Sequence, residues 1–506
     1  MMIRNRLRRM LAMLTLCAVL LGSLTVSAAA ADFQDVPANH WAASEIHDCV
    51  ELGFFNGQSA SWFGLGQSMT RAAFAVVLCR FFGWETAVPT QPIYSDVPLD
   101  AWYAGAVETA YAHGALTRQQ GSEFRPDDPI TRKELTVTLV RAMGYSALAG
   151  LTQEQTLPFT DVEANAGYIA LAYHLGLMNG TSETTFAPDR KATREQVAVI
   201  LMRLYNKLHG TATEKAAILS DAETIPDLTG FSTVAIPAVR LMYASGSKLV
   251  SAMDADACTA LYDAARESGA VTLLHAAASS TALKAKAPES AALLAKAVTD
   301  GGYDGLFLDI PKLKQNNAAA LSALVSALRT ELGDRPLYLM AEAPSLQDSI
   351  YTGYDYAALS QSADHLVLRI AAVSDTSGAL AVAPVDPLEE VYYALNTLRE
   401  TVPVEKLTLL VNTSGTFWRN SSQVKTLSGI EISALLESGS VHQHYSPRYA
   451  CAYLTGAEKQ TASEVIWYLN GKAAAERIRM LQLLGVNQLF LSDLSTASED
   501  QLSALQ

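Results

Sequence analysis

The nine residues YDGLFLDIP, from Tyr303 to Pro311, contain carboxylates whose spacing could support acid–base chemistry. Asp304 and Asp309 flank the apolar run GLFL, which is typical of a buried β-strand. A second apolar run, PLYLMAE, ends on Glu342. If the two runs are adjacent parallel strands, Asp309 and Glu342 lie at the same edge of the sheet, where a carboxylate pair could act on one substrate. The alternative is an ordinary Asp and Glu, partly solvated at loop ends.

The elements that must position these carboxylates follow a regular pattern. After about residue 214, short apolar segments alternate with Ala- and Leu-rich helical segments, which is typical of βα units. This pattern predicts an α/β barrel of the (β/α)8 TIM type over residues 209–506, with an open doubly wound sheet as the alternative. No glycine-rich phosphate loop follows a predicted strand. The predicted strands are 216–219, 233–238, 270–275, 304–310, 336–342, 365–371, 407–412 and 487–492.

The N-terminus predicts a secretory signal peptide over residues 1–31. An apolar run from about residue 10 to 26 ends in the small-residue stretch SAAAA, and it is too short to be a good membrane span. We therefore expect an exported, soluble protein. Four basic residues precede the apolar run: Arg4, Arg6, Arg8 and Arg9.

Charge and cysteine content exclude several classes of function. Without those four arginines the chain has 37 − 4 = 33 basic and 51 acidic residues, a net charge of −18, which argues against nucleic acid or an anionic membrane as partner. We expect no metal and no cofactor, since the cysteines lack ligand spacing and His442 with His444 is a weak pair in a predicted loop. Cys49 and Cys79 could meet within one repeat, or both could be buried hydrophobic residues. The oligomeric state stays open.

Three copies of one pattern occupy residues 32–88, 93–148 and 158–208. Each copy opens with aromatic-x-Asp-Val and later has a Thr-Arg pair, followed by apolar residues at helical spacing. We therefore predict three helix–loop–helix units in an all-α bundle, with each Thr as a helix N-cap. The repeated positions are Asp35, Asp96 and Asp161, and Thr70-Arg71, Thr131-Arg132 and Thr193-Arg194.

The repeated arginine stands at the first helical position, where the helix dipole disfavours a cation. Its recurrence predicts an anion site formed by the guanidinium and free backbone N–H groups. The alternative is a structural ion pair with a neighbouring Asp. Trp41 and Trp102 follow the first two repeated Asp residues by six positions, and Gly167 stands at the third. These aromatics could contact a sugar or belong to the core.

The triplicated motifs resemble the S-layer homology (SLH) domains of Gram-positive surface proteins over residues 32–208. The resemblance implies a pseudo-threefold bundle whose grooves bind secondary cell-wall polysaccharide, in some cases through a pyruvate ketal. It also implies location in the cell wall of a Gram-positive-type bacterium. Two departures are Ala73, where a Glu is expected in the first unit, and Gly167. By resemblance, Arg71, Arg132 and Arg194 contact the acidic group, while Asp35, Asp96, Asp161, Trp41 and Trp102 shape the grooves.

The C-terminal half, from about 214 to 500, resembles family 18 glycoside hydrolases, especially their spore-cortex and peptidoglycan-active branch. The motifs that carry the resemblance are GGYDGLFLDIP, PLYLMAEAP, YDYAALSQSADHLVL and VIWYLNGKAAAERIRMLQLLGVNQLFL. In that family the fourth strand reads DGxxxDxE, whose Glu protonates the glycosidic oxygen and whose last Asp orients the N-acetyl group. Here Asp309 remains and Pro311 replaces the Glu. Other expected groups are replaced by Ala371, Ala372 and Ser492.

Three functions are compatible with this pattern. The first is a wall-anchored protein with a catalytically silent barrel that binds or scaffolds wall glycan. The second is an active hydrolase of peptidoglycan or N-acetylglucosamine polymers in which Glu342 is the acid and Asp309 assists. The third is a purely structural S-layer component. A cleft beside Glu342 with an aromatic floor would favour the second, and the available aromatics are Tyr351, Tyr354, Phe417 and Trp418.

Overall fold

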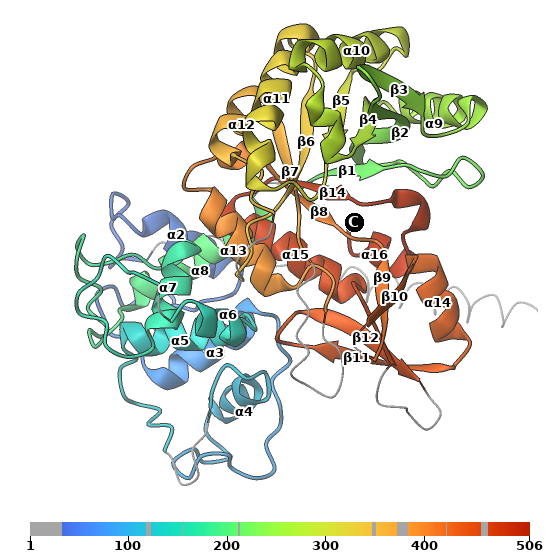
Figure 1. The fold of residues 1–506 in the computed structure, drawn as a ribbon. Helices are drawn as coiled ribbons and strands as arrows, with labels where there is room; N and C mark the ends of the chain where they lie inside the picture. The colour runs from blue at the N-terminus through green and yellow to red at the C-terminus, as the bar shows by residue number, and fades with distance from the viewer. Residues whose placement is uncertain are drawn as a thin grey trace, which may run out of the picture. The chain divides into compact units, whose positions relative to one another are not determined.

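The computed structural model describes residues 33–117, 123–153, 155–210, 213–346, 351–371, 383–420, 422–456 and 464–505 (Figure 1). The chain divides into two compact units. The first contains Met1–Met143 and Ala187–Arg203, and the second contains Gly144–Phe186 and Leu204–Gln506. Within the described ranges, no helix has the length and apolar character needed to cross a membrane.

The first unit is built from helices, as the repeats predict. Helices α3, α5 and α8 begin at the three repeated arginines, so these predicted starts are confirmed. Thr70 and Thr131 cap α3 and α5 by accepting hydrogen bonds from backbone N–H groups of the first turn. The bounds are α2 (Ala43–Glu51), α3 (Arg71–Phe81), α4 (Ala104–Ala112), α5 (Arg132–Ala142) and α8 (Arg194–His209), of which residues 194–203 belong to this unit.

A closed ring of backbone hydrogen bonds holds the first unit together. Met69 N donates to Ala192 O (2.9 Å), Ala192 N donates to Ile130 O (2.9 Å), and Ile130 N donates to Met69 O (2.8 Å). Each of these residues lies two positions before one of the helices that begin with Arg. The ring therefore ties three segments that are far apart in sequence into one arrangement.

The first N–H group of each of these helices is also bound to another segment of the unit. The prediction that these groups are free to receive an anion is therefore wrong, because a neighbouring loop already supplies an acceptor. The bonds, each 2.9 Å long, run from Arg71 N to Asp128 O, from Arg132 N to Arg190 O and from Arg194 N to Gln67 O.

The second unit contains the predicted barrel. Eight parallel strands form one sheet in which β1 pairs with both β14 and β2, so the sheet closes on itself. All eight predicted strands are confirmed, and the open-sheet alternative is wrong. The strands are β1 (Glu214–Ile218), β2 (Phe231–Tyr243), β4 (Val271–Ala278), β5 (Gly305–Asp309), β6 (Leu337–Glu342), β7 (His365–Arg369), β8 (Leu407–Val411) and β14 (Gln488–Leu491). A further strand, β3 (Ser247–Ser251), extends β2 as a hairpin.

Helices follow the strands along the chain, and large apolar side chains fill the barrel interior. Phe307, Met340 and Phe490 are buried in one cluster that leaves no room for a channel. Polar side chains from the last residues of β5, β6 and β7 lie above this cluster, at the carboxyl ends of the strands. The helices of this unit include α6 (Ser146–Leu151), α7 (Ala166–His174), α9 (Ala255–Glu267), α10 (Ala287–Asp300), α11 (Ala318–Leu332), α12 (Tyr356–Ser362), α13 (Leu388–Leu398), α15 (Gly471–Leu484) and α16 (Glu499–Ser503).

A second, antiparallel sheet is inserted between β8 and β14, and the sequence did not predict it (Figure 1). Its strand order is β10-β9-β13-β12-β11, and α14 (Gly429–Glu437) packs on it. His442 and His444 lie on β11, so their assignment to a loop was wrong. The strands are β9 (Gly415–Arg419), β10 (Ser422–Leu427), β11 (Val441–Ser446), β12 (Cys451–Gly456) and β13 (Glu464–Tyr468).

Arg477 of α15 fastens this insertion to the barrel. Its side chain is fully buried, and its guanidinium donates to the carbonyl oxygens of Asp386, Tyr449 and Ala450. The bond from Nε to Asp386 O is 3.1 Å long. One planar cation thus satisfies carbonyl groups of two loops that would otherwise be buried without donors.

We expect Arg477→Ala to lower the free energy of unfolding of the second unit by about 3–5 kcal/mol, because several buried carbonyls lose their donor. Arg479→Ala is the control, since Arg479 pairs at 3.3 Å with Glu476 near the surface and should cost less than about 1 kcal/mol. Thermal unfolding followed by circular dichroism measures both. Equal melting temperatures for the two variants would contradict this role.

Candidate functional site

Three adjacent strands bring Asp309, Glu342 and Arg369 together at the barrel mouth. Arg369 ends β7 and is in register with Glu342, the last residue of β6. Its Nη2 lies 2.7 Å from Asp309 Oδ2, and its Nη1 lies 3.1 Å from Glu342 Oε1. The expectation that the two carboxylates lie close together is therefore met, with one guanidinium between them.

This guanidinium has a direct consequence for acid–base chemistry. Burial acts to lower the pKa of Arg369, but the charges and hydrogen bonds of Asp309 and Glu342 raise it above its ordinary value. Glu342 is almost fully buried, and its Oε1 also accepts a hydrogen bond from Lys312 N (3.3 Å). Glu342 Oε1 thus faces two N–H donors, whereas a general acid must itself donate a proton to the substrate.

A pocket of about 400 Å³ opens beside this cluster. Tyr351 is the only one of the four candidate aromatics in its lining, because Tyr354 is buried and donates to Ile310 O (2.8 Å), and Phe417 and Trp418 lie on β9. The pocket therefore has one aromatic wall beside Glu342. Its lining residues are Pro311, Lys312, Glu342, Tyr351, Arg369, Ile370 and Ala371.

The positions at which the sequence departs from the family 18 pattern lie at the carboxyl ends of their strands. Pro311 and Ala371 line the pocket and offer neither a proton nor an acceptor. Ser492 is the acceptor for Thr413 N (3.0 Å), so its hydroxyl serves the loop after β8. Ala372 lies outside the described residues.

His275 of β4 lies near the Asp309–Arg369 ion pair, whose charges act on its imidazole. Sequence reasoning missed this residue. Burial lowers the pKa of its imidazole to about 4, so the ring is neutral at physiological pH. Within the described part of the chain, neither ring nitrogen has a hydrogen-bond partner, and the same holds for Asp309 Oδ1. A single His in the apolar strand VTLLHAAA was the available signal.

The first unit contains a second candidate site, a groove between α3 and α4. Two adjoining hollows of about 730 and 300 Å³ share Val76, Arg80 and Trp102 in their walls. The Trp102 indole is 70% exposed. Arg194 lines the smaller hollow, and Trp84 lines the larger one. Two of the predicted glycan-binding residues, Trp102 and Arg194, thus meet in one groove.

Arg71 and Arg194 hold neighbouring loops through backbone carbonyls and aromatic rings. Arg71 Nε donates to Phe124 O (2.7 Å), and its Nη1 pairs with Glu134 (2.6 Å). Arg194 Nε donates to Phe63 O (2.9 Å). Burial lowers the pKa of Arg194, against the raising effect of the nearby acids. The alternative interpretation was a structural ion pair between each arginine and a repeated Asp. Within the described residues, neither Arg71 nor Arg194 forms such a pair. Arg132, the middle member of the set, is buried.

The repeated aspartates hold loops by accepting backbone hydrogen bonds. Partial burial acts to raise the pKa of Asp35, but hydrogen bonds from the Phe63, Gly64 and Leu65 N–H groups lower it below its ordinary range. These aspartates therefore fix the loops that precede the helices beginning with Arg, and neither they nor the residues they bind line the two hollows of the groove. The corresponding bonds are Phe63 N to Asp35 Oδ1 (2.8 Å), Phe124 N to Asp96 Oδ1 (2.7 Å) and Phe186 N to Asp161 Oδ1 (2.8 Å).

The third aromatic position is closed to any side chain. A Cβ at Gly167 would lie 1.8 Å from Ala149 O, on helix α6. Thr152, which follows α6, donates its hydroxyl to Gly167 O (2.6 Å) and fixes this contact. Trp41, the first aromatic position, is exposed, and its ring lies 5.4 Å from the tilted ring of His40.

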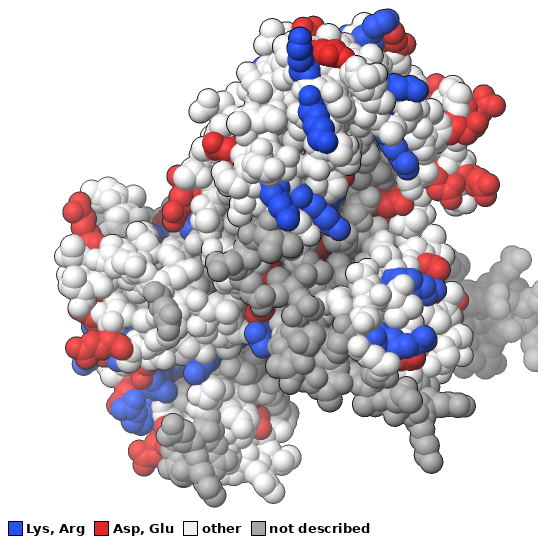
Figure 2. Space-filling model, in the orientation of Figure 1, with Lys and Arg blue, Asp and Glu red and all other residues white. Residues whose placement is uncertain are grey.

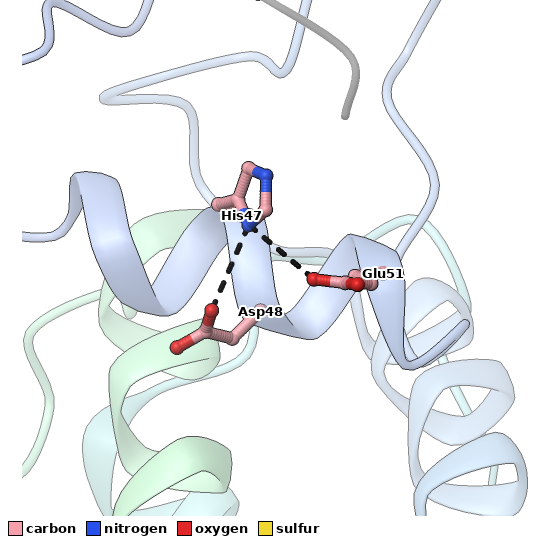
Figure 3. Close-up of side chains that lie close together, drawn as sticks. All are labelled: His47, Asp48 and Glu51. Atoms are coloured by element: carbon pink, nitrogen blue, oxygen red, sulfur yellow. Dashed lines mark ion pairs between the residues drawn. The ribbon is translucent and has the colours of Figure 1, made fainter. Parts of the chain in front are cut away.

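A cluster of His47, Asp48 and Glu51 lies on the surface of α2 (Figure 3). The imidazole Nδ1 is 3.6 Å from Asp48 Oδ1 and 3.7 Å from Glu51 Oε2. All three side chains come from one exposed helix, so the cluster has no second element to complete a coordination shell.

Comparison with known families matches both halves of the chain. The S-layer homology domain matches residues 93–136 and 158–198. The family of glycosyl hydrolases 18 matches residues 275–487, which include the barrel mouth and the inserted sheet.

Individual relatives are similar over only part of their length. An endoglucanase of Bacillus sp. (strain KSM-635) is 29% identical over 213 residues, which are 40% of this chain and 22% of the relative. An S-layer protein of Bacillus thuringiensis subsp. finitimus is 26% identical over 193 residues, 38% of this chain and 23% of the relative. The matched segments thus span less than a quarter of either relative.

A class V chitinase from Pseudomonas fluorescens Pf-5 superimposes with a TM-score of 0.50 at 18% identity. The superposition covers 58% of this chain and 99% of the chitinase. The spore cortex-lytic enzyme SleL of Bacillus megaterium QM B1551 gives a TM-score of 0.48 at 14% identity, over 67% of this chain and 80% of SleL. The likeness to the chitinase shows a shared fold.

His275 predicts a pH-dependent stability. The unfolded chain takes up a proton near the ordinary His pKa of 6.5, whereas burial delays protonation in the folded state to about 4. The free energy of unfolding should therefore fall as the pH drops from 6.5 to 4, by about 2–3 kcal/mol. His275→Phe should remove this part of the pH dependence in urea unfolding, while exposed His442→Phe should retain it. The same pH profile in both variants would contradict the assignment.

Proposed function

We propose that this chain, which combines S-layer homology repeats with a family 18 glycosyl hydrolase domain, is a wall-anchored surface protein whose barrel holds glycan without cleaving it. The repeats would bind secondary cell-wall polysaccharide, pyruvylated or not, and the barrel would contact peptidoglycan glycan strands. The similarity to S-layer and cell surface proteins supports a location at the cell surface.

The groove of the first unit supports the anchoring role. An exposed indole such as that of Trp102 can stack on the apolar face of a sugar ring, and the guanidinium groups of Arg80 and Arg194 can pair with a carboxylate. The groove therefore suits an acidic sugar. At the third aromatic position, Gly167 and α6 leave no space for an equivalent side chain.

One observation carries the proposal that the barrel is silent: Arg369 bridges Asp309 and Glu342, the two carboxylates that the sequence suggested, while Pro311 occupies the position of the acid. Positioned acid–base catalysis contributes on the order of a hundred- to ten-thousand-fold in rate. For Glu342 to replace the acid, it would have to leave the Arg369 guanidinium and gain a proton in a buried site.

The enzymatic alternative keeps one supporting observation. Glu342 does line a pocket that also contains Tyr351, so a sugar ring could reach both side chains. The purely structural alternative has no specific feature in its favour, because a lattice component needs neither the exposed indole of Trp102 nor a pocket at the barrel mouth.

We expect Trp102→Ala to weaken binding of the full chain to purified cell walls by at least about tenfold, because it removes the exposed stacking surface of the groove. Trp62→Ala is the matched control, since Trp62 is 45% exposed and lies outside the lining of both hollows. Co-sedimentation with walls, with and without their polysaccharide, gives both affinities. Unchanged binding of Trp102→Ala would exclude this groove.

We expect the full chain to release no reducing ends from peptidoglycan or from N-acetylglucosamine oligomers, since Asp309 and Glu342 both pair with Arg369. Glycan binding is measured in the same samples by pull-down. Cleavage that disappears in Glu342→Gln would instead establish Glu342 as a relocated acid, with Asp309→Asn testing the assisting role. If the barrel neither binds nor cleaves glycan, the result would favour a purely structural S-layer component.

A further inference from the structure

We infer that the barrel mouth carries a binding surface for a polyanionic polysaccharide, formed by Lys284, Lys286, Lys312 and Lys314. This inference rests on the proposed glycan-holding role of the barrel and specifies the chemical class of its ligand. We call these four residues the lysine rim.

The fold places the lysine rim on two neighbouring loops. Lys284 ends the short helix η1 (Ser280–Lys284) after β4, and Lys286 is the N-cap of α10. Lys312 and Lys314 precede η2 (Gln315–Asn317) after β5. Strands β4 and β5 are paired in parallel, at the usual strand spacing of about 4.8 Å, so the two loops leave the same end of the barrel from adjacent strands. Both η1 and η2 contact α11, which keeps the loops side by side.

The ammonium groups of the lysine rim are available to a ligand. All four lysines are exposed. Within the described part of the chain, none of their side chains forms an ion pair, whereas Lys296 nearby on α10 pairs with Asp300 at 2.5 Å. The positive charge of the rim is therefore not cancelled by a fixed neighbour.

The local charge is opposite to that of the whole protein. Residues 276–290 and 310–318 contain four basic residues and one acidic residue, Glu289, whereas the full chain has 37 basic and 51 acidic residues. Figure 2 shows blue side chains on the front of the region where Figure 1 draws α10, α11 and the loops below them, with red ones mostly at its edges. A basic patch on an acidic protein attracts polyanions selectively, because the remaining surface repels them.

The rim adjoins the pocket at the barrel mouth. Lys312 lines this pocket together with Tyr351 and Arg369. Its backbone has a φ of 60°, a left-handed conformation that costs about 1 kcal/mol or more for a residue with a side chain. Its N–H group is held by Glu342 Oε1, so the Arg369 cluster fixes the loop that carries Lys312 and Lys314. A sugar ring stacked on Tyr351 would place its carboxylate or phosphate groups beside the rim.

The test measures binding of three soluble probes to the full chain: oligogalacturonate, which carries carboxylates, poly(glycerol phosphate), which carries phosphates, and neutral chitotetraose. We expect Lys312→Gln/Lys314→Gln and Lys284→Gln/Lys286→Gln each to weaken binding of a polyanion about tenfold and to reduce its salt dependence. Lys296→Gln/Lys425→Gln changes the net charge equally and should leave the affinity unchanged. The polyanion whose affinity falls in the rim variants shows whether the rim binds carboxylate or phosphate groups.

Four outcomes would overturn the lysine rim. Equal affinity of the rim variants and the control pair for the polyanions would exclude it. Loss of polyanion binding in Trp102→Ala alone would assign that binding to the groove of the first unit. Binding of chitotetraose but of neither polyanion would reject the rim and leave the glycan-holding role intact, whereas binding of no probe would reject both.

Discussion

The constraint on which the barrel mouth depends is the bond of one guanidinium to two carboxylates, of which Glu342 is buried and Asp309 is partly buried. Arg369 pairs with both Asp309 and Glu342 at the ends of adjacent strands, where two unpaired carboxylates would be costly. The same bond fixes the loop after β5 through Lys312 N. An architecture associated with acid–base chemistry is thereby kept, while the groups that would exchange protons are held in ion pairs. Stability and catalysis make opposite demands on these carboxylates, and the proposed silent barrel is one in which stability prevails.

The first unit uses its charged residues in a similar way. The repeated Asp and Arg residues, which looked like ligand-binding groups, bind the backbone of loops. The proposed binding of a ligand in the groove then rests on groups at its surface, above all the exposed indole of Trp102. In both units, therefore, the most conspicuous charged residues organise the protein, and less conspicuous exposed residues remain available to a partner.

The sequence predicted the eight barrel strands because each is an apolar run bounded by turn residues, a signal that does not depend on distant contacts. It did not predict the inserted sheet, since β10 (SQVKTL) is polar and almost wholly exposed and lacks such a run. The predicted strand 365–371 contains Arg369, but its position between Asp309 and Glu342 was not predicted, because that contact depends on the relative register of β5, β6 and β7. His275 was missed because its burial depends on how the barrel closes.

The ring that joins Met69, Ile130 and Ala192 has a further consequence for the evolution of the chain. Each member supplies both a donor and an acceptor, so deleting one segment leaves an unsatisfied group on each of its neighbours. The repeats are therefore not independent folding units, and a single repeat cannot be lost or gained without affecting the others. We expect recombination to transfer the three repeats between proteins as one set. We also expect a truncation within the set to unfold the remaining repeats.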